Sequence, residues 1–245
     1  MTGSMQGHFE RVAPSYDELR APVELHALDA LIAAGDLAGR RVLDIGCGTG
    51  RALTALAAQH GVEGWGVDRS NAMIETARGR VPQSVRLQVG AAEDLPFPDC
   101  FFPRAFMTLV VQHLDRPRAF REIRRILEPG GRLTIQTLDP DTIASGWMAP
   151  LFPSYVEVEQ RRFPGAGVLQ AELEEAGFAR TWCFTHHLRR SLSKRDALET
   201  LRGRAYSTFA LLDADEIAEG IERAERMLTD PVEYTLELLL ITGIR

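Results

Sequence analysis

The chain has 245 residues, of which 45% are hydrophobic and 25% are charged, and its formal net charge is −6 at pH 7. This length and composition predict one large domain with a sizeable core, or one domain with a cap. The acidic balance argues against a protein that binds nucleic acids or membrane surfaces through a basic face. No apolar run approaches the roughly 20 residues of a membrane span, and the N-terminus lacks the apolar region of a signal peptide.

The three cysteines, Cys47, Cys100 and Cys183, are scattered along the chain. Their spacing matches neither a metal site nor a disulfide framework. We therefore expect a reduced, cytoplasmic protein with no metal ligands. Lys194 is the only lysine among many arginines, which is typical of a GC-rich bacterial genome.

Residues 8–17 form the first patterned stretch, His-Phe-Glu-Arg-Val-Ala-Pro-Ser-Tyr-Asp. Phe9, Val12 and Tyr16 recur at helical spacing, so one interpretation is an amphipathic helix whose apolar residues simply pack. Residues 22–34 also carry apolar side chains on one helical face. They predict a helix that packs on a sheet.

Residues 41–50 are the most informative stretch, Arg-Val-Leu-Asp-Ile-Gly-Cys-Gly-Thr-Gly. The apolar run at 42–45 predicts a buried strand, and residues 51–60 predict a helix. A strand, a glycine turn and a helix together present backbone N–H groups and a helix N-terminus to a ligand. Glycine is needed where the backbone passes close to that ligand or adopts a positive φ.

The spacing of the glycines narrows the choice of ligand. A dinucleotide fingerprint, G-x-G-x-x-G, would have its third glycine at position 51, which is Arg51, whereas the third glycine here comes one residue earlier, at Gly50. This disfavours an NAD-dependent dehydrogenase. No Gly-Lys-Ser/Thr follows, so a phosphate-binding P-loop is excluded.

Residues 42–50 closely resemble the glycine motif of class I S-adenosylmethionine (SAM)-dependent methyltransferases, including an acid, Asp44, two positions before the first glycine. The resemblance runs from about residue 9 to residue 138 and is closest to enzymes of the ubiquinone-methyltransferase type. Other stretches that resemble family segments are 9–17 ("F…A…YD"), 90–97 ("G-D-A-E-D-L-P-F"), 101–117 ("F-D-L-V-V-S-S…H-H-L-x-D-P") and 125–131 ("R-V-L-K-P-G-G").

The resemblance implies a SAM site at the glycine turn and the ends of the neighbouring strands. Residues 62–68 predict a second strand that ends in Asp68, the position of the acid that accepts hydrogen bonds from ribose hydroxyls. The alternative role for Asp68 is to cap the next helix, although Ser70 is already placed for that. The positions assigned to the cofactor are Tyr16, Asp44, Gly46, Cys47, Gly48, Gly50, Asp68, Arg69, Ala92, Glu93, Asp94 and Met107.

Residues 85–90 predict a third strand, and in the resembling family the loop after it borders the adenine. A backbone N–H at Ala92 would meet a ring nitrogen, and an acid would accept from the exocyclic amine. Ala91 stands where the family often has aspartate, so both Glu93 and Asp94 are candidates for the acid. The resemblance also implies that the N-terminal segment folds over the cofactor and that Tyr16 reaches the SAM carboxylate or the substrate.

Residues 101–114 resemble the fourth-strand segment, with Pro103 at the strand entry, where a missing N–H matters least. Met107 would then offer its backbone carbonyl to the SAM amine. Gln112 and His113 fall on the substrate side. We take His113 as the candidate general base, with capping or packing as its alternative role.

The last hundred residues fit the family less closely, and prolines, glycines and aromatic residues accumulate at 139–165. We expect this stretch and residues 193–230 to form a cap over the carboxyl ends of the strands. Glu128 to Gly131 predict a turn. The remaining predicted elements are helices at 70–78, 115–127, 168–176, 193–202 and 213–228, and strands at 132–138, 178–188 and 232–244.

The expected fold is a Rossmann-like, doubly wound α/β sheet of seven mostly parallel strands, with an antiparallel last strand and a helical cap insertion. A single methyltransferase domain would span residues 1–245, with its SAM-binding core at 8–138. The expected reaction moves the SAM methyl group to an oxygen, nitrogen or carbon atom of a small molecule, with no nucleic acid or membrane as partner. The alternative is a non-catalytic SAM-binding regulatory or partner protein.

Overall fold

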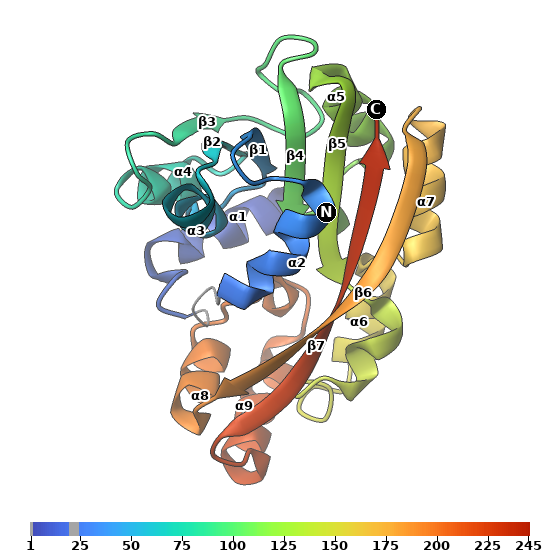
Figure 1. The fold of residues 1–245 in the computed structure, drawn as a ribbon. Helices are drawn as coiled ribbons and strands as arrows, with labels where there is room; N and C mark the ends of the chain where they lie inside the picture. Colours follow the sequence, from blue (N-terminus) through green and yellow to red (C-terminus); the bar gives the residue numbers. More distant parts are fainter. Residues whose placement is uncertain (1, 20–24) are drawn as a thin grey trace.

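The computed structural model describes residues 2–19 and 25–245, which form a seven-stranded sheet flanked by helices (Figure 1). The strands are β1 (Arg41–Ile45), β2 (Glu63–Asp68), β3 (Arg86–Val89), β4 (Phe102–Thr108), β5 (Leu127–Leu138), β6 (Ala179–Leu192) and β7 (Val232–Ile244). The α-helices are α1 (Thr2–Val12), α2 (Leu25–Gly35), α3 (Arg51–His60), α4 (Asn71–Arg78), α5 (Arg116–Ile126), α6 (Tyr155–Arg162), α7 (Ala166–Glu175), α8 (Lys194–Arg202) and α9 (Ala214–Met227). Short 3-10 helices are η1 (Ala13–Ser15), η2 (Val111–His113), η3 (Pro140–Ser145) and η4 (Ser207–Ala210).

The strand order in the sheet is β3-β2-β1-β4-β5-β7-β6. The pairs from β3 across to β5 are parallel, and β7 runs antiparallel to both of its neighbours. The chain therefore winds outward from β1 in both directions, which leaves a crevice at the carboxyl ends of the strands where the order reverses. The predicted fold class, including the antiparallel last strand, is confirmed.

Apolar residues on both faces of the sheet explain why it is covered by helices on both sides. Within β1, Leu43 and Ile45 belong to the cluster under α5 and α7, whereas Val42 belongs to the cluster under α2 and α3. This alternation follows from the two-residue period of a strand. Both clusters consist mainly of fully buried side chains, so the ends of the central strands are held in fixed positions.

Capping residues begin three of the helices close to the predicted positions. The Ser70 hydroxyl accepts the backbone N–H of Met73 at 3.2 Å and so caps α4, which frees Asp68 from that role. Ser193 and Asp213 cap α8 and α9 in the same way.

The structure corrects two predicted boundaries. The strand predicted at 132–138 begins earlier, at Leu127, which pairs with Phe102 of β4. The predicted turn at 128–131 is an irregularity within that strand, because pairing with β4 resumes only at Arg132 and Gly130 has a φ of 76°. The register shift after Phe102 is the irregularity that admits Pro103 into β4. The strand predicted to end at residue 188 continues to Leu192. The first residues of the helix predicted at 22–34 lie outside the described residues.

Residues 139–165 and 193–230, here called the cap, share a hydrophobic cluster of their own. The rings of Phe152 and Phe209 meet edge to face at 5.5 Å between centroids, which joins the two cap segments. A Cβ at Gly220 would lie 2.1 Å from the Phe152 ring, so only glycine lets α9 approach that ring.

Strands β6 and β7 connect the sheet to the cap. Pairing between β5 and β7 ends at Leu138 and Leu238, whereas β6 and β7 remain paired as far as Leu192 and Val232. Figure 1 shows this two-stranded extension running down from the sheet toward α8 and α9. Side chains on one face of the extension are thereby placed below the carboxyl edge of the sheet.

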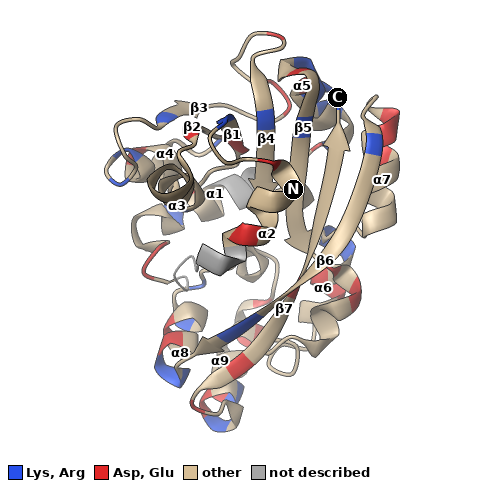
Figure 2. Cartoon of the chain, in the orientation of Figure 1, with Lys and Arg blue, Asp and Glu red and all other residues tan. Residues whose placement is uncertain are grey.

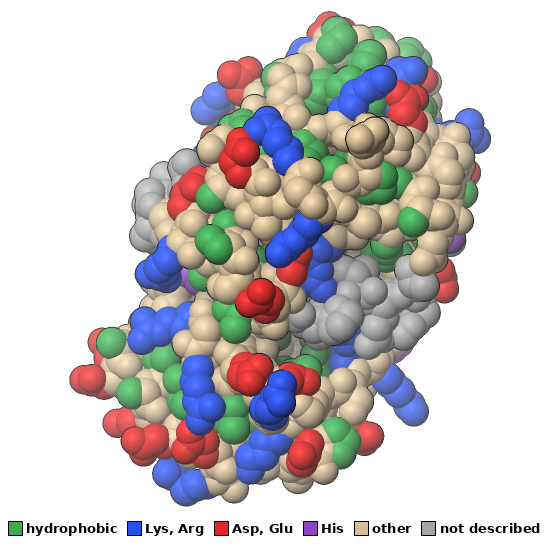
Figure 3. All heavy atoms as spheres, turned by 90° about the vertical axis from the view of Figure 1, so that its left-hand side faces the viewer, with side chains coloured by type: hydrophobic (Ala, Val, Ile, Leu, Met, Phe, Trp, Pro, Cys, Tyr) green, Lys and Arg blue, Asp and Glu red, His purple; other side chains and the backbone are tan. Residues whose placement is uncertain are grey.

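The surface carries charges of both signs. Figure 2 shows acidic and basic residues intermixed on α8 and α9, and Figure 3 shows the same mixture on the face that lies to the left in Figure 1. In the arginine-rich helix α5, Arg116 forms two hydrogen bonds with Glu172, at 2.6 and 2.8 Å. Among the described helices, none is long and apolar enough to cross a membrane.

Candidate functional site

A cavity of about 440 Å³ lies at the carboxyl ends of the strands, between the sheet and the cap. It is bordered by the glycine turn after β1, the ends of β2, β4 and β5, the N-terminal segment and both cap segments. This is the position and the size expected for a small-molecule site in an open α/β sheet.

The three motif glycines have different roles. Gly46, Gly48 and Gly50 all have positive φ, of 73°, 53° and 76°. A Cβ at Gly46 or Gly50 would lie 2.5 Å from Val110 or Val81, so these two glycines are required by packing within the protein. At Gly48 a Cβ would meet nothing within 4 Å, and this residue lines the cavity. Gly48 is therefore the position at which the backbone itself is open to a ligand.

Asp68 stands at the end of β2, beside Gly48. Its two carboxylate oxygens accept the backbone N–H groups of Gly48 and Ser70, both at 2.9 Å. Burial raises the pKa of Asp68, and these two hydrogen bonds oppose the shift. Each oxygen retains lone-pair capacity, so the carboxylate can still accept hydrogen bonds from a ligand that enters the cavity.

Asp44 lies behind the glycine turn and does not line the cavity. Its side chain is 3% exposed. Burial, and then the negative charge of Asp68, raise the pKa of Asp44 well above its usual value. Its carboxyl group therefore favours the protonated form and can act as a hydrogen-bond donor within the protein.

The loop after β3 brings Ala92 and Glu93 to the cavity, whereas Asp94 is exposed and turned away. Of the two candidate acids, only Glu93 is thus placed near a ligand. One of its carboxylate oxygens accepts the backbone N–H of Asp115 at 2.9 Å, which fixes the side chain against the start of α5.

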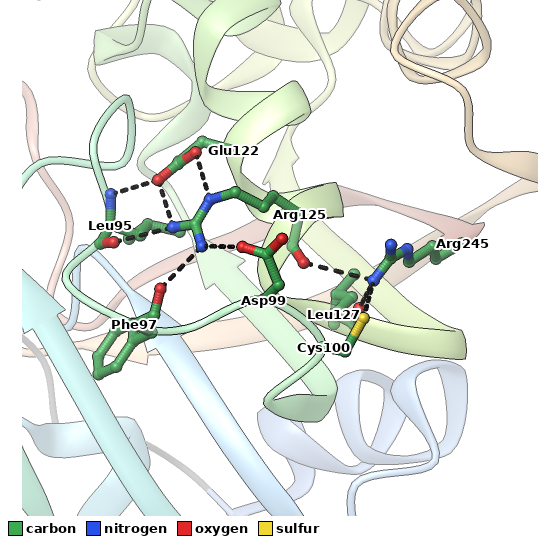
Figure 4. A network of polar contacts seen from close by, with 8 residues as sticks. All are labelled: Leu95, Phe97, Asp99, Cys100, Glu122, Arg125, Leu127 and Arg245. Atoms are coloured by element: carbon green, nitrogen blue, oxygen red, sulfur yellow. Dashed lines mark hydrogen bonds and ion pairs between the residues drawn. The ribbon is translucent and has the colours of Figure 1, made fainter.

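A network of polar contacts between this loop and α5 holds the loop in place (Figure 4). Arg125 of α5 donates to the carbonyls of Leu95 and Phe97 at 3.1 and 2.9 Å, and it pairs with Glu122 and Asp99. Glu122 in turn accepts the Leu95 N–H at 3.0 Å, and the neighbouring guanidinium lowers its pKa. The network therefore holds residues 95–99 against α5, next to the cavity wall at Ala92 and Glu93.

The end of β4 forms the next part of the wall. Met107 is fully buried in the core and does not line the cavity, whereas the next residues, Thr108 to Val110, do. Leu109 has a φ of +55°, an uncommon conformation for a residue with a side chain, and its carbonyl accepts the Gln112 amide at 2.7 Å. Such strained residues cluster at functional sites.

His113 faces the cavity from η2. Its ring meets Phe9 of α1 edge to face, with 5.5 Å between centroids. Burial, and then the positive charge of Arg162, lower the pKa of His113 to about 4. The imidazole is therefore neutral near pH 7 and has a lone pair available to accept a proton.

The N-terminal segment covers one side of the cavity with Phe9 and Tyr16. Asp17 ties it to the glycine turn, because its carboxylate accepts the Thr49 hydroxyl at 2.6 Å and pairs with Arg51 and Arg80. The segment also reaches the cap, where the Thr200 hydroxyl donates to the Leu19 carbonyl at 2.9 Å.

The predicted site residues therefore divide into two groups. Those that line the cavity are Tyr16, Gly46, Gly48, Asp68, Arg69, Ala92, Glu93 and His113. Those that lie behind it or outside it are Asp44, Cys47, Gly50, Asp94 and Met107. The first group comes from five separate chain segments, which the fold brings to one edge of the sheet.

The sequence predicted that the aromatic cap encloses the site, but it did not point to the cavity residues of β5, β6 and β7 or to the buried acid of the cap. They include Gln136, Glu159, Arg190 and Tyr234. Glu159 is 3% exposed, accepts the Thr208 hydroxyl at 2.8 Å and pairs with Arg162. One usable signal was present, since positions 234, 236 and 238 alternate along β7 and all line the cavity.

Comparison with known proteins agrees with this geometry. Residues 43–135 match the model of a methyltransferase domain family. The chain is 36% identical to the biotin biosynthesis bifunctional protein BioHC of Cellvibrio japonicus over 69% of its own length, but it spans only 34% of that protein. It is 29% identical to a demethylmenaquinone methyltransferase of Listeria monocytogenes, over 73% of this chain and 88% of that one.

Solved structures share the fold. A putative methyltransferase from an antibiotic biosynthesis pathway of Anabaena variabilis superposes with a TM-score of 0.71 at 22% identity, covering 92% of this chain and 98% of that one. Residues 43–135 match a methyltransferase domain family, and the chain is similar in sequence and fold to methyltransferases of the SAM-dependent type. SAM is the cofactor of that family, and the open space at Gly48 beside the Asp68 carboxylate fits it.

We expect the Gly48→Ala variant to bind SAM about tenfold more weakly or worse, a loss of about 1.4 kcal/mol or more. The added methyl group would stand in the cavity without touching the protein. Gly61→Ala is the matched control, because Gly61 also has a positive φ, of 62°, and open space around it, but lies outside the cavity. Both variants carry the same backbone strain, so equal SAM affinities by calorimetry would show that Gly48 does not face the cofactor.

We also expect residues 8–19 to exchange their backbone amides more slowly when S-adenosylhomocysteine is bound. Few large apolar side chains anchor this segment, so its opening should be frequent without ligand. Hydrogen exchange read by mass spectrometry measures the change, and α7, on the far side of the sheet, serves as the internal reference. Identical exchange with and without ligand would contradict a segment that closes over the cofactor.

Proposed function

We propose that the chain is a methyltransferase that moves the methyl group of SAM to an oxygen, nitrogen or carbon atom of a small, mainly apolar molecule. One observation carries the proposal. A single cavity joins the glycine turn and Asp68 at one side to an aromatic and aliphatic cap at the other. Such an arrangement holds a cofactor and an acceptor together in one closed space.

SAM supplies an electrophilic methyl group on a sulfonium centre. The protein then has to align the acceptor with that group and exclude water. The cap supports both tasks, because Trp147, Tyr155 and Tyr206 close the side of the cavity opposite the sheet. These side chains offer flat apolar surfaces to an acceptor.

The roles of the cofactor-binding residues follow from their positions. We assign the ribose hydroxyls to Asp68, and the adenine to the backbone of Ala92 and the carboxylate of Glu93. Near the amine of SAM we place the carbonyl groups at the end of β4, and we retain the Met107 carbonyl as a candidate beside that of Thr108. Tyr16 would close the cofactor from the side of the N-terminal segment.

We assign to His113 the removal of a proton from the acceptor. Neutral imidazole accepts a proton, and the lowered pKa of His113 keeps it in that form across the neutral range. A base with a pKa near 4 is weak, so its contribution falls at the low end of the range for general-base catalysis.

The names of the relatives support a small-molecule acceptor. The matched proteins include a demethylmenaquinone methyltransferase and O-methyltransferases of Penicillium expansum and Aspergillus sclerotiorum. The intermixed surface charges agree with this assignment, because a nucleic-acid substrate calls for a strongly basic groove.

Methyl transfer from SAM labelled in the methyl group tests the proposal. A panel of small phenols, amines and keto acids serves as acceptors, with total RNA as a second substrate and Gly48→Ala as the control with weakened SAM binding. We expect label in small organic products. Transfer to RNA that weakens steeply with salt would show that the substrate class is wrong. Tight binding of S-adenosylhomocysteine without transfer to any acceptor would instead favour a non-catalytic SAM-binding protein.

A further inference from the structure

The acceptor side of the cavity contains buried polar atoms without hydrogen-bond partners. They are Thr108 Oγ1, Gln112 Oε1 and Gln136 Nε2, and none of them has a partner among the described residues. All three residues line the cavity. Gln136 is only 3% exposed. Nearly all buried polar groups in proteins are paired, so three unpaired ones at one cavity wall require an explanation.

The three side chains belong to one polar patch. Thr108 and Gln136 are direct partners in the parallel ladder between β4 and β5, and such partners project from the same face of the sheet. Leu109 links them to Gln112, because its N–H donates to the Gln136 carbonyl at 2.8 Å and its carbonyl accepts the Gln112 amide at 2.7 Å. The left-handed φ of Leu109 turns the chain sharply at this point.

The surroundings of the patch are mainly apolar and aromatic, although the charged residues Glu159 and Arg190 line the same cavity. Aliphatic side chains from three strands and α2 adjoin it, and aromatic side chains from the cap and β7 close the other side. The aliphatic ones are Leu28, Leu138, Leu188, Leu236 and Leu238, and the aromatic ones are Trp147, Tyr155, Tyr206 and Tyr234. A flat, mainly apolar molecule with a polar group on one edge suits these aromatic and aliphatic walls.

The chemistry of the patch defines that polar group. The Gln136 amide N–H can only donate, the Gln112 Oε1 can only accept, and the Thr108 hydroxyl can do both. A hydroxyl group satisfies all of them, since its oxygen accepts from Gln136 and its hydrogen donates to Gln112. A hydrocarbon would leave all three unpaired, which weakens its binding.

We propose that Gln136 is a specificity-determining residue that binds the oxygen of a hydroxyl group on a flat, mainly apolar methyl acceptor, with Gln112 and Thr108 completing the subsite. This inference rests on the proposed function, because it places the acceptor in the cap-side half of the cavity. It adds the substrate class, a hydroxyarene, and the residue that recognises its oxygen.

Binding of 2-naphthol and of naphthalene to the full chain saturated with S-adenosylhomocysteine tests the proposal. The two probes have the same flat ring system and differ only in the hydroxyl group. We expect the wild-type chain to prefer 2-naphthol about tenfold, the scale of one hydrogen bond inside a protein. Gln136→Met keeps the volume of the side chain and removes its polar atoms, so the preference should fall to about twofold or less.

Gln83→Met is the matched control, because Gln83 is exposed and lies outside the cavity; its preference should stay at the wild-type value. Gln112→Met serves as a second variant if Gln136→Met does not fold, and it should also reduce the preference. An unchanged preference in the folded variants, or no saturable binding of 2-naphthol by the wild-type chain, would overturn the proposal.

The same preparations separate this inference from the proposed function. Transfer of labelled methyl groups to the acceptor panel is measured beside the binding. A hydroxyl preference that depends on Gln136, with no methyl transfer to any acceptor, would contradict the proposed methyltransferase activity while supporting the proposed subsite. Methyl transfer together with a hydroxyl preference that does not depend on Gln136 would contradict the proposed subsite and support the proposed methyltransferase activity.

Discussion

Turnover by the His113→Asn variant is expected to fall about 100-fold, the low end of the range for losing a general base, while its affinity for SAM stays unchanged. Asparagine retains a polar side chain of similar reach but cannot take up a proton at neutral pH. The comparison uses kcat with saturating acceptor, and SAM affinity from calorimetry. His187→Asn is the matched control, because His187 lies on β6 with its side chain 64% exposed.

The pH dependence of kcat gives an independent check. A base must be deprotonated to work, and the pKa of His113 is lowered to about 4. The rate should therefore stay level as pH falls through 6.5 and decline only as it approaches 4. A decline centred near pH 6.5 that disappears in His113→Asn would contradict a His113 whose pKa is lowered by burial and by the nearby positive charge of Arg162. Undiminished turnover in the variant would leave alignment of acceptor and cofactor as the whole catalytic effect.

The same pKa has a consequence for stability. Between pH 6.5 and 4 the unfolded chain binds a proton at His113 that the folded chain does not bind, so the folded state loses stability as pH falls through this window. The loss from this one group is roughly 3 kcal/mol, at about 1.4 kcal/mol for each pKa unit. Acid unfolding of His113→Asn should be correspondingly less steep there.

The Asp68→Ala variant is expected to bind SAM about 10- to 100-fold more weakly, which corresponds to the roughly 1.5–3 kcal/mol of a hydrogen bond to a charged group. Calorimetry measures the affinity. The carboxylate also accepts two backbone N–H groups that alanine leaves unpaired, so the variant will lose some stability as well. SAM titrations must therefore be made below its unfolding temperature.

Ser70→Ala is the control that separates the two effects. It removes the cap of α4 but keeps the Asp68 carboxylate and its contact with the Ser70 N–H. This variant should lose about 1 kcal/mol of stability, the usual cost of removing an N-cap, and bind SAM normally. If Asp68→Ala binds SAM as tightly as Ser70→Ala does, the ribose assignment is wrong.

The cofactor side of the cavity could be predicted because its residues lie in short contiguous strings. Gly46 to Gly50 follow directly after β1, and Asp68 is the last residue of β2, so local sequence fixes both their conformation and their place at the sheet edge. The same strings do not reveal which residues face outward. Gly48 and Gly50 look alike in sequence, yet only the first lines the cavity, because Val81 from another segment packs against the second.

The acceptor side could not be predicted in this way. Gln136, Arg190 and Tyr234 come from three strands that are adjacent only in the folded sheet, and each is an ordinary residue in its own sequence context. Strand register decides which face each side chain occupies. Register depends on pairing partners about 50 to 100 positions away, which neither periodicity nor composition reports.

The two-stranded extension formed by β6 and β7 has a consequence for how such a chain can diversify. The extension and the helices inserted between its strands form one continuous stretch that contributes much of the acceptor side, whereas the glycine turn and Asp68 lie far upstream. Replacement of this stretch by the corresponding stretch of another protein would change the acceptor side of the cavity in a single step. The new β7 would have to pair with β5 in the same register. The upstream part of the chain, with the glycine turn and Asp68, would remain unaltered.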